Sequence, residues 1–177
     1  MKFVIKYFAE ITIKSKPVRR RFVGQLVDNL RAVLRDLDPD VVVRRSWDRL
    51  QVETQVSDPV RVLALVEAMR NTPGITYILE VVEYALPPLD EIAVGVLSVY
   101  SEQLEGKTFA VRCKRSGRHT FTSVDVERAV GAALLAGTGA AGVSLKHPQV
   151  TVDLEISDES LYVVANRHRG PGGYPVG

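Results

Sequence analysis

The first 82 residues alternate between two hydrophobic periodicities, and the order of these periodicities restricts the fold more than any other feature. Six segments follow one another as strand, helix, strand, strand, helix and strand, over residues 2–8, 17–37, 41–43, 50–56, 59–72 and 75–82. Pro17 suits the first turn of the first helix, and Asp58-Pro59 supplies the cap and first position of the second. This order predicts a ferredoxin-like split unit, a sheet with two helices on one face.

Each predicted helix carries an apolar stripe. In the first helix the stripe residues recur mainly three or four positions apart: Val18, Phe22, Leu26, Leu30, Val33, Leu34 and Leu37. In the second helix we expect Leu63, Val66 and Met69 to face inward. Pro73-Gly74 ends this helix before the last strand of the unit.

Two consecutive prolines, Pro87-Pro88, mark a boundary because neither can continue a helix or a sheet ladder. Beyond them the pattern predicts a helix, a strand, a second helix and a hairpin, over residues 89–104, 108–114, from 123, and 150–156 with 161–166. We therefore predict an α+β chain, with a ferredoxin-like domain over residues 1–84 and an α/β domain over 85–169. The glycine- and proline-rich tail, residues 170–177, is predicted to be a linker that packs on no core.

Composition narrows the class of protein. The chain has 177 residues, room for one ordinary domain or two small ones. Its single cysteine, Cys113, excludes an internal disulfide and fits a reducing cytoplasm. Lys6 interrupts the apolar start that a signal peptide needs, and the longest uncharged run, residues 129–145, is short and rich in glycine. We expect a cytoplasmic protein without a membrane segment.

Charge is unevenly distributed although the net charge is only +2. Residues 1–50 hold 12 Lys/Arg against 6 Asp/Glu, residues 51–106 hold 2 against 9, and residues 107–177 hold 9 against 6. Two basic segments that flank an acidic one are compatible with nucleic-acid binding. Solvated charge on helix faces explains the counts equally well.

The clearest basic pattern is the predicted strand 108–114 with the loop that follows it. Arg112 and Lys114 share one face with Ala110, and the strand continues into Arg115-Ser116-Gly117-Arg118-His119. Cations side by side on a strand and a loop can contact successive phosphates. The alternative is a solvated strand edge protected by lysine.

A second basic segment surrounds the start of the first helix. Its five cations are Lys14, Lys16, Arg19, Arg20 and Arg21, and a phosphate there would meet free backbone N–H groups. We take Lys14 and Lys16 as candidate RNA contacts. The three consecutive arginines point in different directions on a helix, so we do not expect all of them to serve one patch.

No group of residues predicts catalysis. Gly137-Thr138-Gly139-Ala140-Ala141-Gly142 matches a dinucleotide-binding motif, but a predicted helix precedes it and a short strand, 143–146, follows, which is the wrong context. His119, His147 and His168 lack metal-site spacing, so we expect no metal. Cys113 lies on the apolar face of its strand and is interpreted as a buried hydrophobe.

The chain resembles the ThiI family of bacterial tRNA 4-thiouridine synthases, or tRNA sulfurtransferases, along essentially its whole length. The resemblance in the first half rests on residues 1–6, 10–15, Trp47-Asp48 and 73–75. In the second half it is to the THUMP domain, an RNA-binding module, and rests on residues 104–109, Val111-Arg112, 114–119, 123–128, His147-Pro148 and 172–177. It implies binding of the acceptor stem and 3′ CCA end of tRNA. As contacts it implies Arg112, Lys114, Arg115, Arg118, His119, Lys146 and Arg167.

The family's chemistry belongs to a following ATP-pyrophosphatase domain, which adenylates uridine 8 of tRNA. The resemblance implies that this chain itself holds no catalytic residue and no cofactor, with ATP used by a catalytic domain expected after Gly177. A cysteine desulfurase is the implied sulfur donor to the full enzyme, whose sulfur also serves thiamine thiazole synthesis in the family. A homodimer is possible within the family.

Two other functions remain open from the sequence. One is a THUMP module that carries tRNA to a different modifying enzyme, such as a methyltransferase or a pseudouridine synthase. The other is a ferredoxin-like sensor of a small molecule. A metabolite that raises the melting temperature, with no effect of tRNA, would favour the sensor.

Overall fold

The computed structural model describes residues 1–46 and 48–177, which fold as two compact units. The first unit comprises Met1–Val81 with Asn166–Gly177, and the second comprises Val82–Ala165. Strands β4 (Ile75–Ala85) and β8 (Ser160–Arg169) each contribute residues to both units. Trp47, one of the residues on which the resemblance rests, lies outside the described residues.

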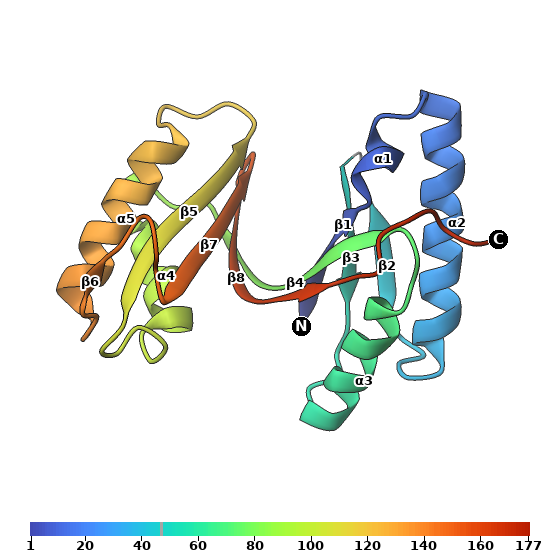
Figure 1. The fold of residues 1–177 in the computed structure, drawn as a ribbon, viewed down its shortest axis with the longest axis horizontal. Helices are drawn as coiled ribbons and strands as arrows, with labels where there is room; N and C mark the ends of the chain where they lie inside the picture. Colours follow the sequence, from blue (N-terminus) through green and yellow to red (C-terminus); the bar gives the residue numbers. More distant parts are fainter. Residues whose placement is uncertain (47) are drawn as a thin grey trace. The chain divides into compact units, whose positions relative to one another are not determined.

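The first unit has the predicted order of strands and helices, with one additional short helix, α1. Its elements are β1 (Lys2–Tyr7), α1 (Ala9–Thr12), α2 (Lys16–Arg35), β2 (Val42–Arg45), β3 (Arg49–Glu53), α3 (Pro59–Arg70) and β4. The strands lie in the order β2-β3-β1-β4 with antiparallel neighbours. Helices α2 and α3 lie on the same side of this sheet (Figure 1).

The core of the first unit joins the sheet to these two helices. Phe3 and Ile5 of β1, Leu26 and Leu30 of α2 and Met69 of α3 are fully buried and pack in one cluster. The prediction that Val33 and Leu63 face inward is wrong. Val33 is 41% exposed and Leu63 is 61% exposed. In α3 the buried face follows Leu65, Val66 and Met69, so a stripe started at position 63 lies off that face.

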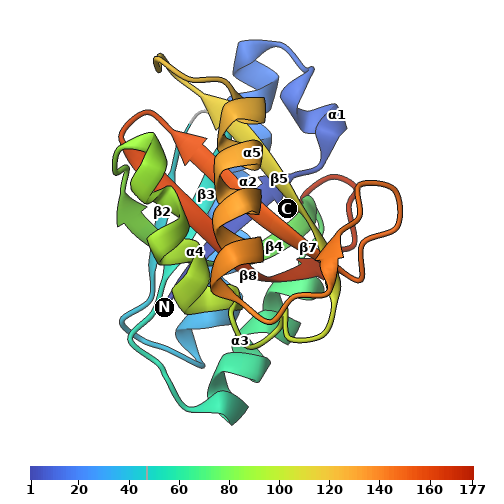
Figure 2. The ribbon, with the colours of Figure 1, turned by 90° about the vertical axis from the view of Figure 1, so that its left-hand side faces the viewer.

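The second unit also consists of strands covered by helices. Besides parts of β4 and β8, its elements are η1 (Leu89–Glu91), α4 (Ile92–Tyr100), β5 (Thr108–Ser116), α5 (Ser123–Gly137), β6 (Gly142–Val143) and β7 (Val150–Ser157). The strands lie in the order β8-β7-β5-β6, with β5 parallel to both neighbours and β7 antiparallel to β8. Helices α4 and α5 lie side by side over this sheet (Figure 2).

Helix α5 begins where the sequence predicts it. Thr122 is its N-cap: the backbone amide of Asp125 donates to the Thr122 hydroxyl oxygen at 3.2 Å, and the Thr122 amide donates to the Asp125 carboxylate at 2.8 Å. These bonds from Thr122 hold the pKa of Asp125 below its usual value. The reciprocal cap fixes the exit of the chain from the loop that follows β5.

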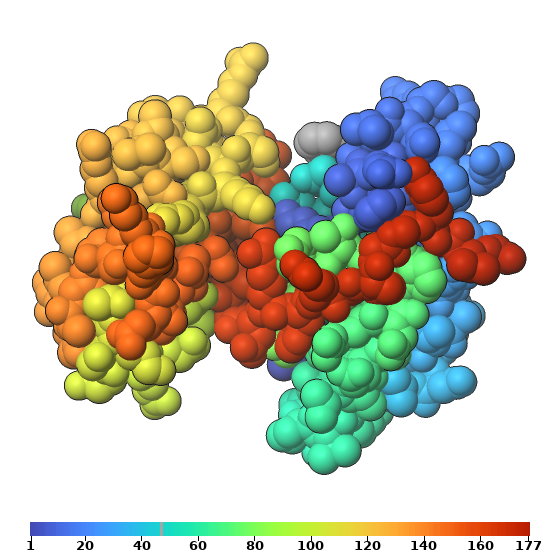
Figure 3. Space-filling model, in the orientation of Figure 1, coloured from blue at the N-terminus to red at the C-terminus, as the bar shows by residue number. Residues whose placement is uncertain are grey.

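The glycine- and proline-rich tail packs on the first unit (Figure 3). The Tyr174 ring stacks on Phe22 at 5.0 Å between centroids and meets Phe8 edge-on at 5.6 Å. Its hydroxyl donates to the Glu10 carboxylate at 2.8 Å, and the Gly172 amide donates to the Ile75 carbonyl at 2.7 Å. The expectation that residues 170–177 pack on no core is therefore wrong, because one aromatic ring and a few backbone bonds anchor the segment.

Candidate nucleic-acid interface

Strand β5 presents the predicted basic residues on an exposed face. Arg112 and Lys114 are exposed, while Phe109, Val111 and Cys113 are buried. Ala110, which the alternation places on the same face, is fully buried, so this face is covered at its first position. The exposed basic part of the strand is therefore its second half, next to the loop.

The pairing of β5 with β7 places acids beside these cations. Arg112 is in register with Asp153, and Lys114 is in register with Glu155, which is only 7% exposed. Opposite charges on neighbouring strands attract, so the positive field of this strand face is partly balanced. The sequence could not reveal this balance, because it does not say which strand lies beside which.

The β5 loop, which we define as residues 115–119, is held by a chain of side-chain bonds. Arg115 Nη1 lies 2.8 Å from His119 Nδ1, and His119 Nε2 lies 2.7 Å from the Asp158 carbonyl oxygen. A guanidinium can only donate and a carbonyl can only accept, so Nδ1 accepts and Nε2 carries the proton of a neutral ring. The His119 ring also stacks on Phe121 at 5.2 Å.

This network assigns different roles to the predicted contacts in the loop. Arg115 and His119 are half-buried and shape the loop, and Arg115 Nη1 also donates to the Gly117 carbonyl at 3.1 Å. Arg118 is exposed at the tip. Arg118 is therefore the loop residue that is best placed to meet a phosphate, while Arg115 and His119 position it.

Beside β5 lies a hollow of about 340 Å³ between this strand, α5 and the segment after β6. Its lining includes two arginines, Arg112 and Arg128, and the apolar Val124, Val143 and Leu145. It also includes Glu127, whose carboxylate accepts from the Cys113 amide at 3.0 Å. Arg112 Nη2 donates to the Leu145 carbonyl at 2.8 Å, which brings it close to the exposed Lys146. Arg128 was missed, because only the packing of α5 on β5 places it in this lining.

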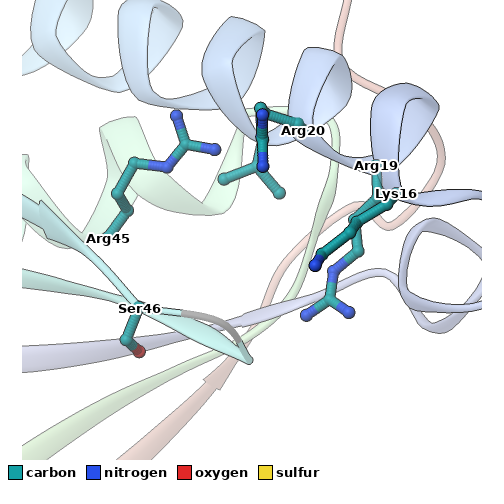
Figure 4. Close-up of a pocket in the computed structure, with 6 residues that line it drawn as sticks. Lys16, Arg19, Arg20, Arg45 and Ser46 are labelled. Carbon is teal, nitrogen blue, oxygen red and sulfur yellow. The ribbon is translucent and has the colours of Figure 1, made fainter.

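A second basic site lies in the first unit, and we call it the α2–β2 pocket. It has a volume of about 340 Å³ and is lined by Lys16, Arg19, Arg20, Val23, Arg45 and Ser46. Lys16 and Arg19 extend from α2 toward the strand end, and Arg45 extends from β2 toward α2 (Figure 4). Two of the three consecutive arginines thus share one site, whereas Arg21 lies over the Phe22 ring, 5.7 Å from its centroid.

Tyr7 holds the strand side of this pocket. Its hydroxyl donates to the Ser46 carbonyl at 3.2 Å. Burial raises the pKa of Tyr7 to about 12, although the nearby Arg45 and Arg19 act in the opposite direction. The hydroxyl therefore stays protonated at neutral pH and remains a donor. Sequence reasoning gave Tyr7 no role, because its partner is 39 residues away.

The remaining predicted contacts, Lys14 and Arg167, lie elsewhere in the first unit. Lys14 Nζ is 5.5 Å from the centroid of the Tyr174 ring, away from the pocket lining. Arg167 Cζ lies 4.2 Å over the Tyr77 ring, a cation–π geometry. Arg167 belongs to the first unit although the sequence assigned it to the second domain.

Cys113, the one cysteine of the sequence, is buried in β5. Burial, with Glu127 adding to it, raises the pKa of Cys113 to about 11, so its thiol is a poor nucleophile at neutral pH. Within residues 1–46 and 48–177 no cluster of three His, Cys, Asp or Glu side chains could hold a metal ion. The same residues include no helix with the length and apolar character needed to cross a bilayer.

The fold and its basic surfaces define a two-domain α+β protein with candidate polyanion sites in both units. Family models match the same two regions: a ThiI ferredoxin-like domain over residues 2–78 and a THUMP domain over residues 88–166. The chain therefore combines a ThiI ferredoxin-like domain with a THUMP domain. The predicted fold class is confirmed.

The curated relatives agree with these family models. The chain is 52% identical over 177 residues to a protein named tRNA sulfurtransferase from Pseudomonas aeruginosa (strain LESB58), and 54% identical to one of the same name from Azotobacter vinelandii (strain DJ). Each alignment covers all of this chain but only 37% of the relative.

Solved structures share the fold. PH1313 from Pyrococcus horikoshii Ot3 matches with a TM-score of 0.81 at 22% identity, over 99% of this chain and 57% of that one. A 4-thiouridine synthetase crystallised with RNA and ATP matches with a TM-score of 0.77 at 21% identity, over 99% and 43%. TrmN from Thermus thermophilus matches with 0.62 at 23% identity, over 93% and 45%.

Proposed function

We propose that this chain is the tRNA-binding part of a tRNA sulfurtransferase that converts uridine 8 of tRNA to 4-thiouridine. Its identity of 52% to a protein named tRNA sulfurtransferase, over the whole chain, is the observation that carries the proposal. The exposed cations around the β5 loop supply what phosphate binding requires. In this proposal ATP and a sulfur-donating cysteine desulfurase bind outside the residues of this chain, in a protein that has the length of the relatives.

We further propose that the second unit holds the acceptor stem and the 3′ CCA end. Unpaired bases are usually bound by stacking on flat or apolar side chains, with cations nearby for the phosphates. The hollow beside β5 offers both, with Val143 and Leu145 exposed and Arg112 and Arg128 in the lining. This combination fits a single-stranded end better than a continuous duplex.

Competition binding tests the proposal. We expect labelled tRNA to be displaced by tRNA much more effectively than by single-stranded DNA of equal length, with affinity that falls steeply as salt rises. Arg118→Ala is expected to weaken binding about fivefold. The slope of log affinity against log salt concentration should become shallower by about 0.9, because one phosphate contact is lost. Arg35→Ala is a matched control, because it removes an exposed arginine outside the candidate sites.

The 3′ end is tested with tRNA that lacks CCA. Removal of CCA is expected to weaken binding to the wild-type chain about tenfold, by loss of base stacking. In Leu145→Asp the difference between the two tRNAs is expected to shrink, because a carboxylate in the hollow repels the RNA. Equal binding of both tRNAs by the wild-type chain would contradict the assignment of the CCA end.

The alternative of a carrier for another modification has less support. The match to TrmN is at 23% identity and concerns the fold alone. The family model for residues 2–78 is that of the ThiI ferredoxin-like domain. The two functions can be separated in a strain whose tRNA lacks 4-thiouridine and which expresses a protein of the relatives' length that contains this chain. Return of 4-thiouridine, measured by the absorbance of the tRNA in the near ultraviolet, would favour the sulfurtransferase over a carrier for another modification.

A further inference from the structure

Four cations from two separate elements converge on the α2–β2 pocket. Lys16, Arg19 and Arg20 come from one face of α2, and Arg45 comes from the end of β2 (Figure 4). The described lining contains no carboxylate. The nearby Asp48 carboxylate accepts from the Ser46 hydroxyl at 3.4 Å and pairs with Arg49 at 3.1 Å, a cation outside the described lining.

Two of these cations, Lys16 and Arg20, are placed unfavourably on α2 when no anion is bound. Lys16 and Arg20 are four residues apart on α2, and like charges at this spacing destabilise a helix by roughly 0.2–0.5 kcal/mol. They also lie in the first turns of α2, where the helix dipole disfavours cations and where no acid is present. An anion bound among these side chains would attract each of them and so offset both unfavourable interactions.

The geometry favours a phosphate at the end of a chain over one within it. Cations that meet at one volume from two sides suit a compact group with several charged oxygens. A phosphomonoester has three terminal oxygens and a charge of about −1.5 to −2 at pH 7, whereas an internal phosphodiester carries a single charge. The pocket volume of about 340 Å³ lies at the lower end of small-ligand sites, roughly 300–1,000 Å³.

We infer that the α2–β2 pocket is a phosphomonoester site that takes the 5′-terminal phosphate of the bound tRNA. The inference rests on the proposed function, which supplies RNA as the partner. It adds a contact that reads the chemical state of the RNA end, so the protein distinguishes a mature 5′-monophosphate from a 5′-hydroxyl. Tyr7 is a positioning residue in this site, since it holds Ser46 and with it the end of β2.

The test compares the same tRNA with a 5′-monophosphate and with a 5′-hydroxyl, in chloride buffer at pH 7.5. We expect the wild-type chain to bind the phosphorylated form about tenfold more tightly, the gain of one or two charge-assisted hydrogen bonds. In Arg20→Gln and Arg45→Gln this ratio is expected to fall below twofold. Both side chains are exposed, so the variants should keep the wild-type melting temperature.

Matched variants separate the site from general charge. Arg118→Gln should weaken both RNAs and keep the tenfold ratio, and Arg35→Gln should change neither. The wild-type ratio should also decline toward one as pH falls from 7.5 to 5.5, because a phosphomonoester gains a proton with a pKa near 6. Inorganic phosphate at millimolar concentration should compete with the phosphorylated RNA only.

The outcomes that overturn the inference differ from those that overturn the proposed function. A ratio near one with strong tRNA binding refutes the phosphate site and leaves tRNA binding intact. A tenfold ratio that survives in Arg45→Gln places the 5′ phosphate elsewhere, and equal competition by inorganic phosphate against both RNAs indicates an internal phosphate. Absence of any preference for tRNA over single-stranded DNA refutes the proposed function itself.

Discussion

The two basic sites of this chain are built in opposite ways. In the α2–β2 pocket, regular elements aim their cations at one volume. Around the β5 loop the cations are spread along a strand, a loop and the segment after β6, and two of them, Arg112 and Arg115, bond to the protein itself. Convergent cations suit one compact anion, whereas distributed cations suit a run of phosphates.

The two sites also differ in how they are held. The pocket relies on the helix and the strand end, with Tyr7 bonded to Ser46. The loop relies on the bonds of Arg115 and His119 and on Gly117, which has a φ of 96°. A substitution that disturbs local backbone should therefore damage the loop more than the pocket.

The largest expected effect tests whether the strand beneath the loop is rigid. Since the pKa of Cys113 is raised from 9.0 to about 11, its thiolate fraction near neutral pH is lower by about a hundredfold. Alkylation by iodoacetamide at pH 8 should be slower by at least this factor than in the urea-unfolded chain. Rapid alkylation of the native chain would mean that β5 opens, and the comparison would fail.

The raised pKa of Cys113 also predicts that the stability of the fold depends on pH. The folded pKa lies above the unfolded one, so the stabilising contribution is complete below pH 9 and is lost as pH rises from 9 to about 11. Urea unfolding at pH 8 and pH 11 measures this loss, and Cys113→Ala should remove that part of it. An unchanged pH dependence in the variant would contradict the assignment to Cys113.

Double variants test whether the cations of each site act on one anion or on several phosphates. Arg118→Ala and Lys146→Ala should each weaken tRNA binding about fivefold and together about 25-fold, because independent contacts add in free energy. Arg20→Gln and Arg45→Gln should together cost hardly more than either alone, about tenfold, since both act on one phosphate. Additive losses in the pocket would show that its cations bind separate phosphates.

A glycine pair tests how the loop is held. A Cβ at Gly117 would lie 2.3 Å from Asp158 Oδ1, and the residue has a positive φ. Gly117→Ala should distort the loop and weaken tRNA binding roughly fivefold, with about 1–2 kcal/mol lost from the free energy of unfolding. Gly106→Ala is the control, because Gly106 also has a positive φ but no atom within 4 Å of the added Cβ. Equal tRNA affinity in both variants would exclude the collision with Asp158 as the cause.

The smallest expected effect concerns the pocket. Tyr7→Phe removes the hydrogen bond to Ser46 and should lower the free energy of unfolding by about 1 kcal/mol. The preference for 5′-phosphorylated tRNA should fall about twofold, with binding of the 5′-hydroxyl form unchanged. A larger loss that affects both RNAs equally would indicate that Tyr7 supports the whole unit rather than the strand end.

Much of the fold could be predicted from the sequence. Periodicity gave the order of the elements in both halves, and Thr122 with Asp125 marked the start of α5, because caps and amphipathic stripes are local. Leu63 was predicted wrongly because the stripe was started off the buried face of α3, whereas the tail was predicted wrongly because its packing partners lie far along the chain. Whether an apolar or aromatic side chain is covered depends on residues far along the chain, as Tyr174 on Phe22 shows.

The candidate sites, like the fold, were predictable from the sequence only in part. The sequence by itself determined which residues carry charge, and it singled out the run from Arg112 to His119 and the cluster from Lys14 to Arg21. Only the tertiary structure decided that Arg45 joins Arg19 and Arg20, that Arg115 and His119 support the loop, and that Asp153 and Glu155 flank the strand cations. Charge is a property of a residue, but an electrostatic field depends on distances, and strand pairing and helix packing set those distances.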